Sequence, residues 1–226
     1  LLVGNASHIE KDWAWIASLN EEYQATISNA SAEYSLLAVQ GPKAIEAMQR
    51  LTDFDLSLLP FYAHTTTTFA GLNNILVATT GYTGAGGVEI YCKNEVVAEL
   101  WEAVFKAGED LGIQPIGLAA RDTLRLEMGY CLYGNEIDDN TSPIAAGLGW
   151  VTRPNTNFLN AAQIGEEKRS GTAQKLIGFE LTERGIPRSG HTIVDTAGET
   201  IGRVTSGTQS PSLEKAIGLG YVPAAL

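Results

Sequence analysis

Residues 117–153 read GLAARDTLRLEMGYCLYGNEIDDNTSPIAAGLGWVTR, a stretch in which a helix gives way to a polar turn. The pattern predicts a short helix that carries Arg121 and Arg125 one turn apart and ends at Gly129. A turn rich in Asn and Asp follows, beginning at Gly134. Arginines beside aromatic and carboxylate side chains at a helix end suit the recognition of a flat, polar anion. The stretch therefore predicts one part of a small-molecule site.

Composition limits the classes of protein to which the chain can belong. It has 226 residues, is 44% hydrophobic and contains 24 glycines, which predicts a sizeable core with many turns and a mixed α and β protein. The net charge is -11, with 15 basic and 26 acidic side chains. Nucleic acid and anionic membrane surfaces would repel that charge, so neither is expected as a partner.

The chain shows no sequence signature of a metal site or a membrane span. Its two cysteines and three histidines are scattered, so no metal is expected and both thiols are predicted to be buried in a reducing compartment. No run has the length of a transmembrane helix. The first residues, Leu1 to Gly4, resemble the end of a strand, which predicts that the chain begins inside a longer protein.

The first half alternates between strand and helix patterns. Helices are predicted over about residues 8–20, after Gly41-Pro42 and after Asn94, the first of them begun by a capping box of Ser7 and Glu10. Strands are predicted over residues 25–27, 34–39, 65–69, 75–79 and 88–91. These elements suggest two βαβ-like units and an α+β sandwich that is ferredoxin-like or related to it.

The character of the chain changes near residue 174. Short apolar alternations around residues 177–181, 193–194, 201–204 and 217–221 predict a small antiparallel β-barrel. The polar segment 155–172 is predicted to be a linker. Two domains are therefore expected, over residues 1–170 and 171–226.

Glu89 is the candidate binding residue of the first half. The loop Gly81–Gly87 before it lacks the spacing of a nucleotide-binding motif and is followed by a strand, so it is interpreted as a wide turn with positive φ angles. Glu89 lies on the strand face opposite Val88 and Ile90. It is either a solvent-facing side chain or a carboxylate that accepts two hydrogen bonds from an amino-pyrimidine edge.

The residues of the opening stretch leave similar alternatives. Arg121 is either an exposed helix residue or a ligand contact, and Arg125 can pair with Asp122 one turn back. Tyr130 and Tyr133 are either rim residues or stacking surface. No nucleophile–base arrangement is present, and the pair Asp138-Asp139 is expected to cap its own turn.

Four segments together resemble one known family. They are residues 81–91 (GYTGAGGVEIY), residues 117–151, the turn 184–188 (RGIPR) and residues 205–224 (TSGTQSPSLEKAIGLGYVPA). In this order they resemble the glycine cleavage system T protein, a folate-dependent aminomethyltransferase. The resemblance runs along essentially the whole chain.

The resemblance implies a function and a set of site residues. Proteins of this family receive an aminomethyl group from the lipoyl arm of H protein and, with tetrahydrofolate, release ammonia. Lipoylated H protein and folate are thus the implied partners, in the bacterial cytoplasm or the mitochondrial matrix. By motif, Glu89 would bind the pterin amino edge and Arg121 would contact the folate. Tyr82 and Tyr130 would stack on the ring, and Asn5 is a weaker candidate.

The chain also departs from the family pattern. An Asp-Asp pair that precedes the family's first strand has no match, because its place would lie upstream of Leu1. No catalytic residue is therefore predicted within residues 1–226. The family's last strands are also without a match, and Ala85-Gly86 stand where an acidic residue is usual. The chain is expected to be a fragment that is inactive alone.

Two other functions are compatible with the same folate-binding pattern. One is the folate-binding portion of a dimethylglycine or sarcosine oxidoreductase. The other is a non-catalytic folate-binding protein of iron–sulfur maintenance, against which the sequence Met128 to Tyr133 counts because it lacks a KGCY-like motif.

Overall fold

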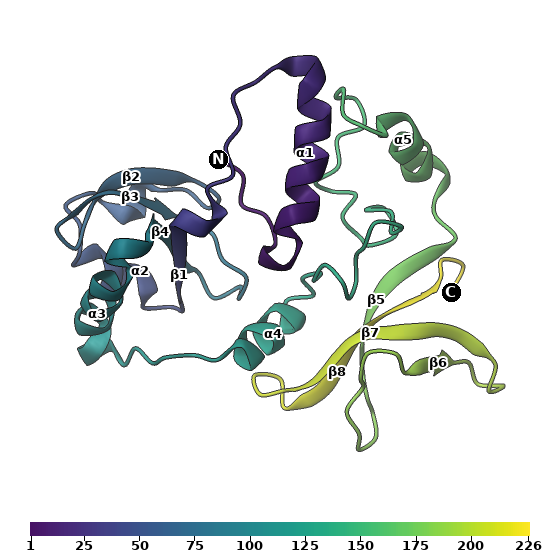
Figure 1. Ribbon diagram of the computed structural model, residues 1–226. Coiled ribbons are helices and arrows are strands. Elements are labelled where there is room, and N and C mark those ends of the chain that lie inside the picture. The colour runs from purple at the N-terminus through teal and green to yellow at the C-terminus, as the bar shows by residue number, and fades with distance from the viewer. The chain divides into compact units, whose positions relative to one another are not determined.

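The computed structural model describes residues 1–226 and divides them into two compact units, residues 1–115 and 116–226 (Figure 1). The first unit contains α1 (Ile9–Tyr23), β1 (Tyr34–Gln40), α2 (Ala44–Gln49), β2 (His64–Phe69), β3 (Leu72–Ala78), β4 (Gly87–Lys93) and α3 (Val97–Gly108). The second contains α4 (Leu118–Glu127), α5 (Ala161–Ser170), β5 (Gln174–Glu180), β6 (Thr192–Val194), β7 (Thr200–Ser210) and β8 (Lys215–Pro223). No helix is long and apolar enough to cross a membrane.

The sheet of the first unit has the strand order β1-β4-β3-β2, and every neighbouring pair is antiparallel. The predicted α+β class is confirmed, but the two expected βαβ-like units are wrong in detail. Strands β1 and β2, which α2 connects, lie at opposite edges of the sheet, and α3 follows β4 without a further strand in this unit. Since strand patterns do not encode direction, the sequence could not separate these topologies.

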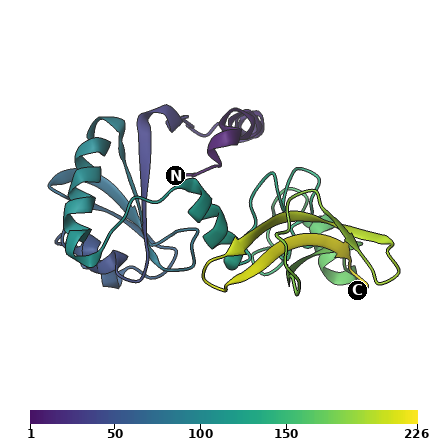
Figure 2. The same cartoon turned by 90° about the horizontal axis from the view of Figure 1, so that it is seen from below.

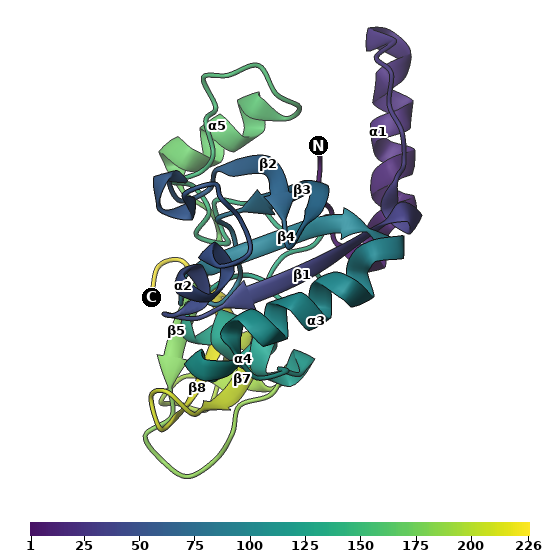
Figure 3. The same ribbon diagram turned by 90° about the vertical axis from the view of Figure 1, so that its left-hand side faces the viewer.

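One face of this sheet forms the core of the unit. Helices α2 and α3 lie on that face, as Figure 2 and Figure 3 show. Both contribute to a cluster of buried side chains that includes Met48, Val77, Val88, Ile90 and Leu100. The alternation of strand side chains places the other residues of β4 on the opposite face, which α2 and α3 do not cover. Leu36 on that face is 40% exposed.

The first residues of the chain were predicted as the end of a strand, and this prediction is wrong. Leu1 to Gly4 are exposed and belong to no strand or helix, and the Leu1 side chain is 93% exposed. Two leucines and a valine in succession have the composition of a strand. Composition alone forms no strand, because a strand also requires a neighbouring strand with which its backbone can pair.

The first helix also differs from the prediction. Helix α1 starts at Ile9 after a short 3-10 turn, Ala6–His8, and no side chain caps it. Ser7 instead makes hydrogen bonds with the side chains of Asn5 and His8, so the capping box is absent. Residues 25–27, predicted as a strand, are irregular.

The sheet of the second unit has the order β5-β8-β7-β6 and is entirely antiparallel, as expected. Two glycines allow other chain segments to lie close against it. A Cβ atom at Gly207 would lie 2.3 Å from the Pro187 carbonyl oxygen, and one at Gly218 would lie 2.5 Å from the Phe179 ring. Real Cβ atoms do not approach this closely. A side chain at position 207 is therefore excluded by backbone, and one at position 218 would require the Phe179 ring to move.

The predicted linker is partly helical. Residues 161–170 of the segment 155–172 form α5, in which Ile164 is the one buried residue with a large apolar side chain. A single apolar residue makes no helical stripe, so the sequence pattern of this segment does not indicate a helix. The domain division at residue 170 stays a prediction.

Candidate functional site

Glu89 lies in the middle of the uncovered sheet face of the first unit. Its strand, β4, runs between β1 and β3, and its partners across the sheet are Ala38 on one side and Ala78 on the other. Two methyl side chains leave space around a carboxylate, because neither reaches over it. The next row on the same face consists of Leu36, Tyr91 and Leu76. Glu89 is therefore a half-buried acid beside an apolar and aromatic strip.

Two hydroxyl groups donate hydrogen bonds to the Glu89 carboxylate. Thr80 Oγ1 donates to Oε2, and the Tyr91 hydroxyl donates to the same oxygen at 3.3 Å. Burial and the neighbouring Glu89 charge raise the pKa of Tyr91 to about 12. The phenol therefore remains protonated at neutral pH and can act as a donor. Glu89 is thus held by its neighbours, unlike a mobile solvent-facing side chain.

The loop Gly81–Gly87 is a wide turn fastened to the end of β1, and its predicted positive φ angles are confirmed at Gly84, Gly86 and Gly87. Gln40 Nε2 donates to the carbonyl oxygens of Thr80 at 3.1 Å and Val88 at 3.2 Å, one at each end of the loop. Thr83 Oγ1 donates to Gln40 Oε1 at 3.0 Å. The Gln40 amide therefore fixes where the loop leaves and rejoins the sheet.

The other two candidates of the first unit differ in their surroundings. Tyr82 lies in this loop and is half-buried. Asn5 is exposed, and its side-chain oxygen accepts a hydrogen bond from Ser7 at 3.4 Å. Tyr82 lies seven residues before Glu89, on a loop whose two ends are hydrogen-bonded to Gln40. No such contact with the sheet supports Asn5 as a site residue. The role of Asn5 in binding stays a prediction.

Leu1, upstream of which the Asp-Asp pair is expected, has an apolar and exposed side chain that can neither accept nor donate a proton. Leu1 is therefore no site residue. The place of the pair before Leu1 stays a prediction from the resemblance.

Arg121 and Tyr130 belong to the second unit. Arg121 lies on α4 and is exposed, and Tyr130 is half-buried just after the helix ends. The Gly129 φ angle of 69° ends the helix there, as predicted. The Tyr130 carbonyl oxygen accepts a hydrogen bond at 3.0 Å from Arg125 Nη1. A buried arginine therefore fixes the backbone that carries Tyr130.

Arg125 is a structural residue whose burial the sequence did not reveal. Its side chain has no exposed surface, and it pairs with Glu136, which is equally buried, at 2.7 Å. The predicted pair with Asp122 is confirmed at 2.9 Å. Arg125 Nη2 also donates to Ser206 Oγ of β7 at 2.7 Å. The ion pair therefore connects α4, the polar turn and the second sheet.

Glu136 completes this network from the turn. Its Oε2 accepts from the Leu132 amide at 2.9 Å, and its Oε1 accepts from Thr205 Oγ1 at 2.7 Å. All of its side-chain oxygens are thereby satisfied, as a buried carboxylate requires. In the sequence, the only signal for this network is the glutamate in the turn. Its partner Thr205 could not be predicted, because it lies 69 residues away along the chain.

Asp138 of the polar turn acts locally, as predicted. Asp138 Oδ1 accepts hydrogen bonds from Thr141 Oγ1 at 2.7 Å and from the Asn140 amide at 2.9 Å. These bonds lower the pKa of Asp138, with the Thr141 hydroxyl as the largest cause. Asp138 therefore shapes the turn.

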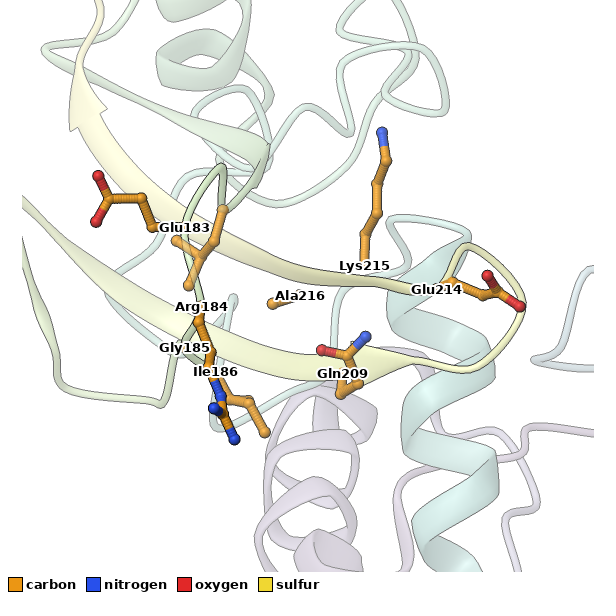
Figure 4. A pocket seen from close by; sticks show the side chains of 9 residues that line it. Glu183, Arg184, Gly185, Ile186, Gln209, Glu214, Lys215 and Ala216 are labelled. Carbon is orange, nitrogen blue, oxygen red and sulfur yellow. The ribbon is translucent and has the colours of Figure 1, made fainter.

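A shallow groove of about 410 Å³ in the second unit is lined by residues 181 and 183–186 and by the β7–β8 hairpin. The charged ends of Glu183, Glu214 and Lys215 point in different directions (Figure 4). Lys215 is also paired with Glu180 at 2.7 Å. Because its polar groups do not converge, the groove makes a poorer binding site than the surroundings of Glu89.

Neither cysteine nor any metal-type cluster adds to the site. No group of three or more His, Cys, Asp or Glu residues is arranged to hold a metal ion. Burial raises the pKa of both cysteine thiols, Cys92 and Cys131. The predicted burial is confirmed for Cys92, whereas Cys131 is half-buried.

Two family models match the chain and together cover most of it. The GCVT N-terminal domain matches residues 1–156, and the glycine cleavage T-protein C-terminal barrel domain matches residues 174–226. The chain is also similar to a solved structure, the glycine cleavage system aminomethyltransferase T of Bartonella henselae. That similarity has a TM-score of 0.65 at 25% identity and covers 85% of this chain and 76% of the other.

Curated relatives agree with the family models. The aminomethyltransferase of Flavobacterium psychrophilum is 56% identical over 99% of this chain, and that of Bacteroides thetaiotaomicron is 55% identical over 98%. The chain spans 62% of the length of each. The four segments that carry the resemblance thus lie in a chain that is similar throughout. The chain belongs to the glycine cleavage T-protein family.

Proposed function

We propose that this chain contributes the folate-binding part of an aminomethyltransferase of glycine cleavage. In the proposed reaction a tetrahydrofolate nitrogen attacks the methylene carbon of an aminomethyl group carried on the lipoyl arm of H protein. The carbon–sulfur bond breaks and returns the thiol of the lipoyl arm, and a second folate nitrogen then displaces the amino group as ammonia. The two folate N–H protons pass to the sulfur and to the ammonia, and the carbon stays bound to both nitrogens as a methylene bridge. Relatives named aminomethyltransferase, at 56% and 55% identity, support this function.

The surroundings of Glu89 are the observation that carries the proposal. A pterin presents a flat ring and an edge of N–H donors, so it requires an acceptor carboxylate beside an apolar or aromatic surface. Glu89 supplies the carboxylate, and the row of Leu36, Tyr91 and Leu76 supplies the surface. The residues of the uncovered face therefore fit the chemical character of the pterin.

The remaining roles follow from the family resemblance. Tyr82 and Tyr130 supply ring-stacking surface, Arg121 contacts the folate, and Asn5 is a secondary contact. Transfer by such a site depends on placing the folate nitrogen against the methylene carbon, so its residues act by positioning and electrostatics. The predicted compartment, bacterial cytoplasm or mitochondrial matrix, stays a prediction.

The alternative functions have less support. A dimethylglycine or sarcosine oxidoreductase and a folate-binding protein of iron–sulfur maintenance would both use a folate site of this kind. The similar relatives from Flavobacterium psychrophilum and Bacteroides thetaiotaomicron are named aminomethyltransferases, and no observation on the site favours either alternative.

Folate binding by matched variants tests the proposal. Glu89→Gln removes the negative charge with little change in volume, and Glu99→Gln makes the same change at an exposed position of α3. We expect Glu89→Gln to weaken tetrahydrofolate binding about tenfold, since hydrogen bonds to a charged acceptor are the stronger class. Glu99→Gln should bind as the unaltered chain does. Equal affinities for all three, measured by calorimetric titration, would refute the role of Glu89.

A further inference from the structure

We infer that Thr80 is the residue that orients the Glu89 carboxylate and presents its second oxygen, Oε1, to a ligand. Thr80 follows β3 and precedes the Gly81–Gly87 loop, so it stands beside β4 without being part of a strand. Its hydroxyl donates to Glu89 Oε2. It is thus a positioning residue, which acts through Glu89.

The donors to Glu89 are arranged on one side of the carboxylate. Thr80 and Tyr91 both donate to Oε2. A carboxylate oxygen accepts about two hydrogen bonds, so these donors occupy Oε2 and leave Oε1 as the oxygen with accepting capacity. A glutamate on an uncovered face would otherwise sample several rotamers. Two donors on one oxygen select the orientation in which the other oxygen meets a ligand.

Thr80 is the better placed of the two donors. The Tyr91 hydroxyl lies 3.3 Å from Oε2, beyond the usual range for such a bond, whereas the Thr80 hydroxyl lies closer. A threonine hydroxyl is attached at Cβ, so its position is fixed by the backbone and one torsion. The Tyr91 hydroxyl also comes from the residue two places along the same strand, so it cannot tie Glu89 to another segment.

The backbone of Thr80 is held in turn by Gln40. Gln40 Nε2 donates to the Thr80 carbonyl oxygen at 3.1 Å. The glutamine amide fills the space next to residue 81, since a Cβ atom on Gly81 would lie 1.9 Å from Gln40 Oε1. Only glycine at position 81 permits this arrangement. The hydroxyl of Thr80 therefore stands at a fixed point relative to both β1 and β4.

A comparison without ligand tests the contact itself. Thr80→Val replaces the hydroxyl with a methyl group of similar size, and Thr68→Val makes the same change where the hydroxyl donates to Asn73 at 2.9 Å. We expect Thr80→Val to lower the urea midpoint of the chain more when Glu89 is present than in the Glu89→Gln background. Thr68→Val should have the same effect in both backgrounds. Additive effects of Thr80→Val and Glu89→Gln would overturn the inference.

A second measurement tests the functional consequence and rests on the proposed function. We expect Thr80→Val to weaken tetrahydrofolate binding about tenfold, as loss of a hydrogen bond to a charged group implies. Thr80→Ser, which keeps the hydroxyl, should restore the affinity to within about threefold, since a difference below that size corresponds to less than one ordinary hydrogen bond. Unchanged binding by Thr80→Val, or equal weakening by Thr80→Ser, would contradict the role of the hydroxyl.

The two measurements separate the inference from the proposed function. If the unaltered chain binds no folate while Thr80→Val and Glu89→Gln remain non-additive, the proposed function fails and the orientation of Glu89 by Thr80 stands. If folate binds and the two substitutions are additive, the inference fails while the proposed function survives.

Discussion

Glu89 and Glu136 show how differently one residue type is used in the two units. Glu89 accepts hydrogen bonds at one oxygen on an uncovered sheet face. Glu136 is enclosed, with donors at both oxygens and an arginine at 2.7 Å. The first arrangement leaves accepting capacity for a ligand, and the second uses all of it for structure. The number of donors already in place therefore distinguishes a carboxylate that can still accept hydrogen bonds from a ligand from one that the structure uses fully.

The ionisation of Tyr91 reports the charge at Glu89. Its pKa is raised to about 12, first by burial and then by the Glu89 carboxylate. Glu89→Gln removes that negative charge, so the phenolate forms more easily and the pKa of Tyr91 falls. The phenolate absorbance of the chain, followed against pH and compared with Tyr91→Phe, measures this shift. An unchanged titration would mean that the two side chains do not interact.

The buried ion pair of Arg125 and Glu136 should be costly to break. Arg125→Met leaves the Glu136 carboxylate buried without its cation, and we expect a loss of about 3–5 kcal/mol in the free energy of unfolding. The control is Arg169→Met, which removes a surface pair with Glu166 whose side chains are 70% and 64% exposed. That pair should contribute almost nothing. Urea unfolding measures the free energy of unfolding of both variants. Similar decreases in the two would contradict the burial of Arg125.

At the residue scale, the sequence predicted the strand face or helical turn of a residue better than its contacts with distant parts of the chain. Glu89 was placed on the correct strand face because strand alternation fixes which side chains oppose the core. The pairing of Arg125 with Asp122 was predictable because it lies within one helical turn. The contact of Arg125 with Ser206 was not, since 81 residues separate them and no local pattern connects such positions.

The glycines of the Gly81–Gly87 loop show how the fold limits the residues that a loop can contain. A Cβ atom at Gly87, where φ is 134°, would lie 2.2 Å from the Val39 carbonyl oxygen. One at Gly86, where φ is 74°, meets nothing within 4 Å. Gly86→Ala therefore introduces backbone strain alone, about 1 kcal/mol, whereas Gly87→Ala adds a collision with β1 and should cost more. Comparable unfolding midpoints in urea for the two variants would argue against this register of the loop.

The hairpin between β7 and β8 is attached to the end of α4 by Glu127. The carboxylate accepts from Ser212 Oγ at 2.9 Å, from the Ser212 amide at 3.2 Å and from Ser210 Oγ at 2.5 Å. Burial acts to raise the pKa of Glu127, but these hydrogen bonds together outweigh it and the pKa is lowered from 4.5.

The lowered pKa of Glu127 predicts how the stability of the chain depends on pH in the acid range. Because the folded-state pKa of Glu127 is below the unfolded one, its contribution is fully present above about pH 4.5 and is lost as the pH falls through the folded value. We expect the stability of Glu127→Gln to depend less on pH in this acid range than that of the unaltered chain. Chemical denaturation at a series of pH values measures the difference, and parallel curves would exclude a role for the carboxylate.

Helices and strands were predictable where the periodic pattern of apolar residues extends over enough positions. Strands β1, β4 and β8 alternate clearly and were placed within a few residues. Helix α5 was missed because it buries a single large apolar side chain, and residues 25–27 were too few to establish a strand. Strand order in the first sheet depends on long-range pairing, which the periodicity of single segments does not specify.

At the scale of the whole molecule the family determines what should be measured. The chain spans 62% of the length of its relatives. The resemblance predicts that the Asp-Asp pair of the family has no match within residues 1–226. We expect residues 1–226 to bind tetrahydrofolate weakly and to release no ammonia when lipoylated H protein carrying an aminomethyl group is added. An ammonia assay tests this. Turnover at the rate of a complete aminomethyltransferase would refute the account of the catalytic carboxylate.

The tip of the Gly81–Gly87 loop has a practical consequence for labelling. Ala85 is exposed at the tip, while the loop ends are fastened by Gln40. The two natural thiols have raised pKa values, so little thiolate is available from them at neutral pH. The thiol of Ala85→Cys should therefore be labelled selectively, and the emission of the attached fluorophore would test the proposal that folate binds near Tyr82 and Glu89.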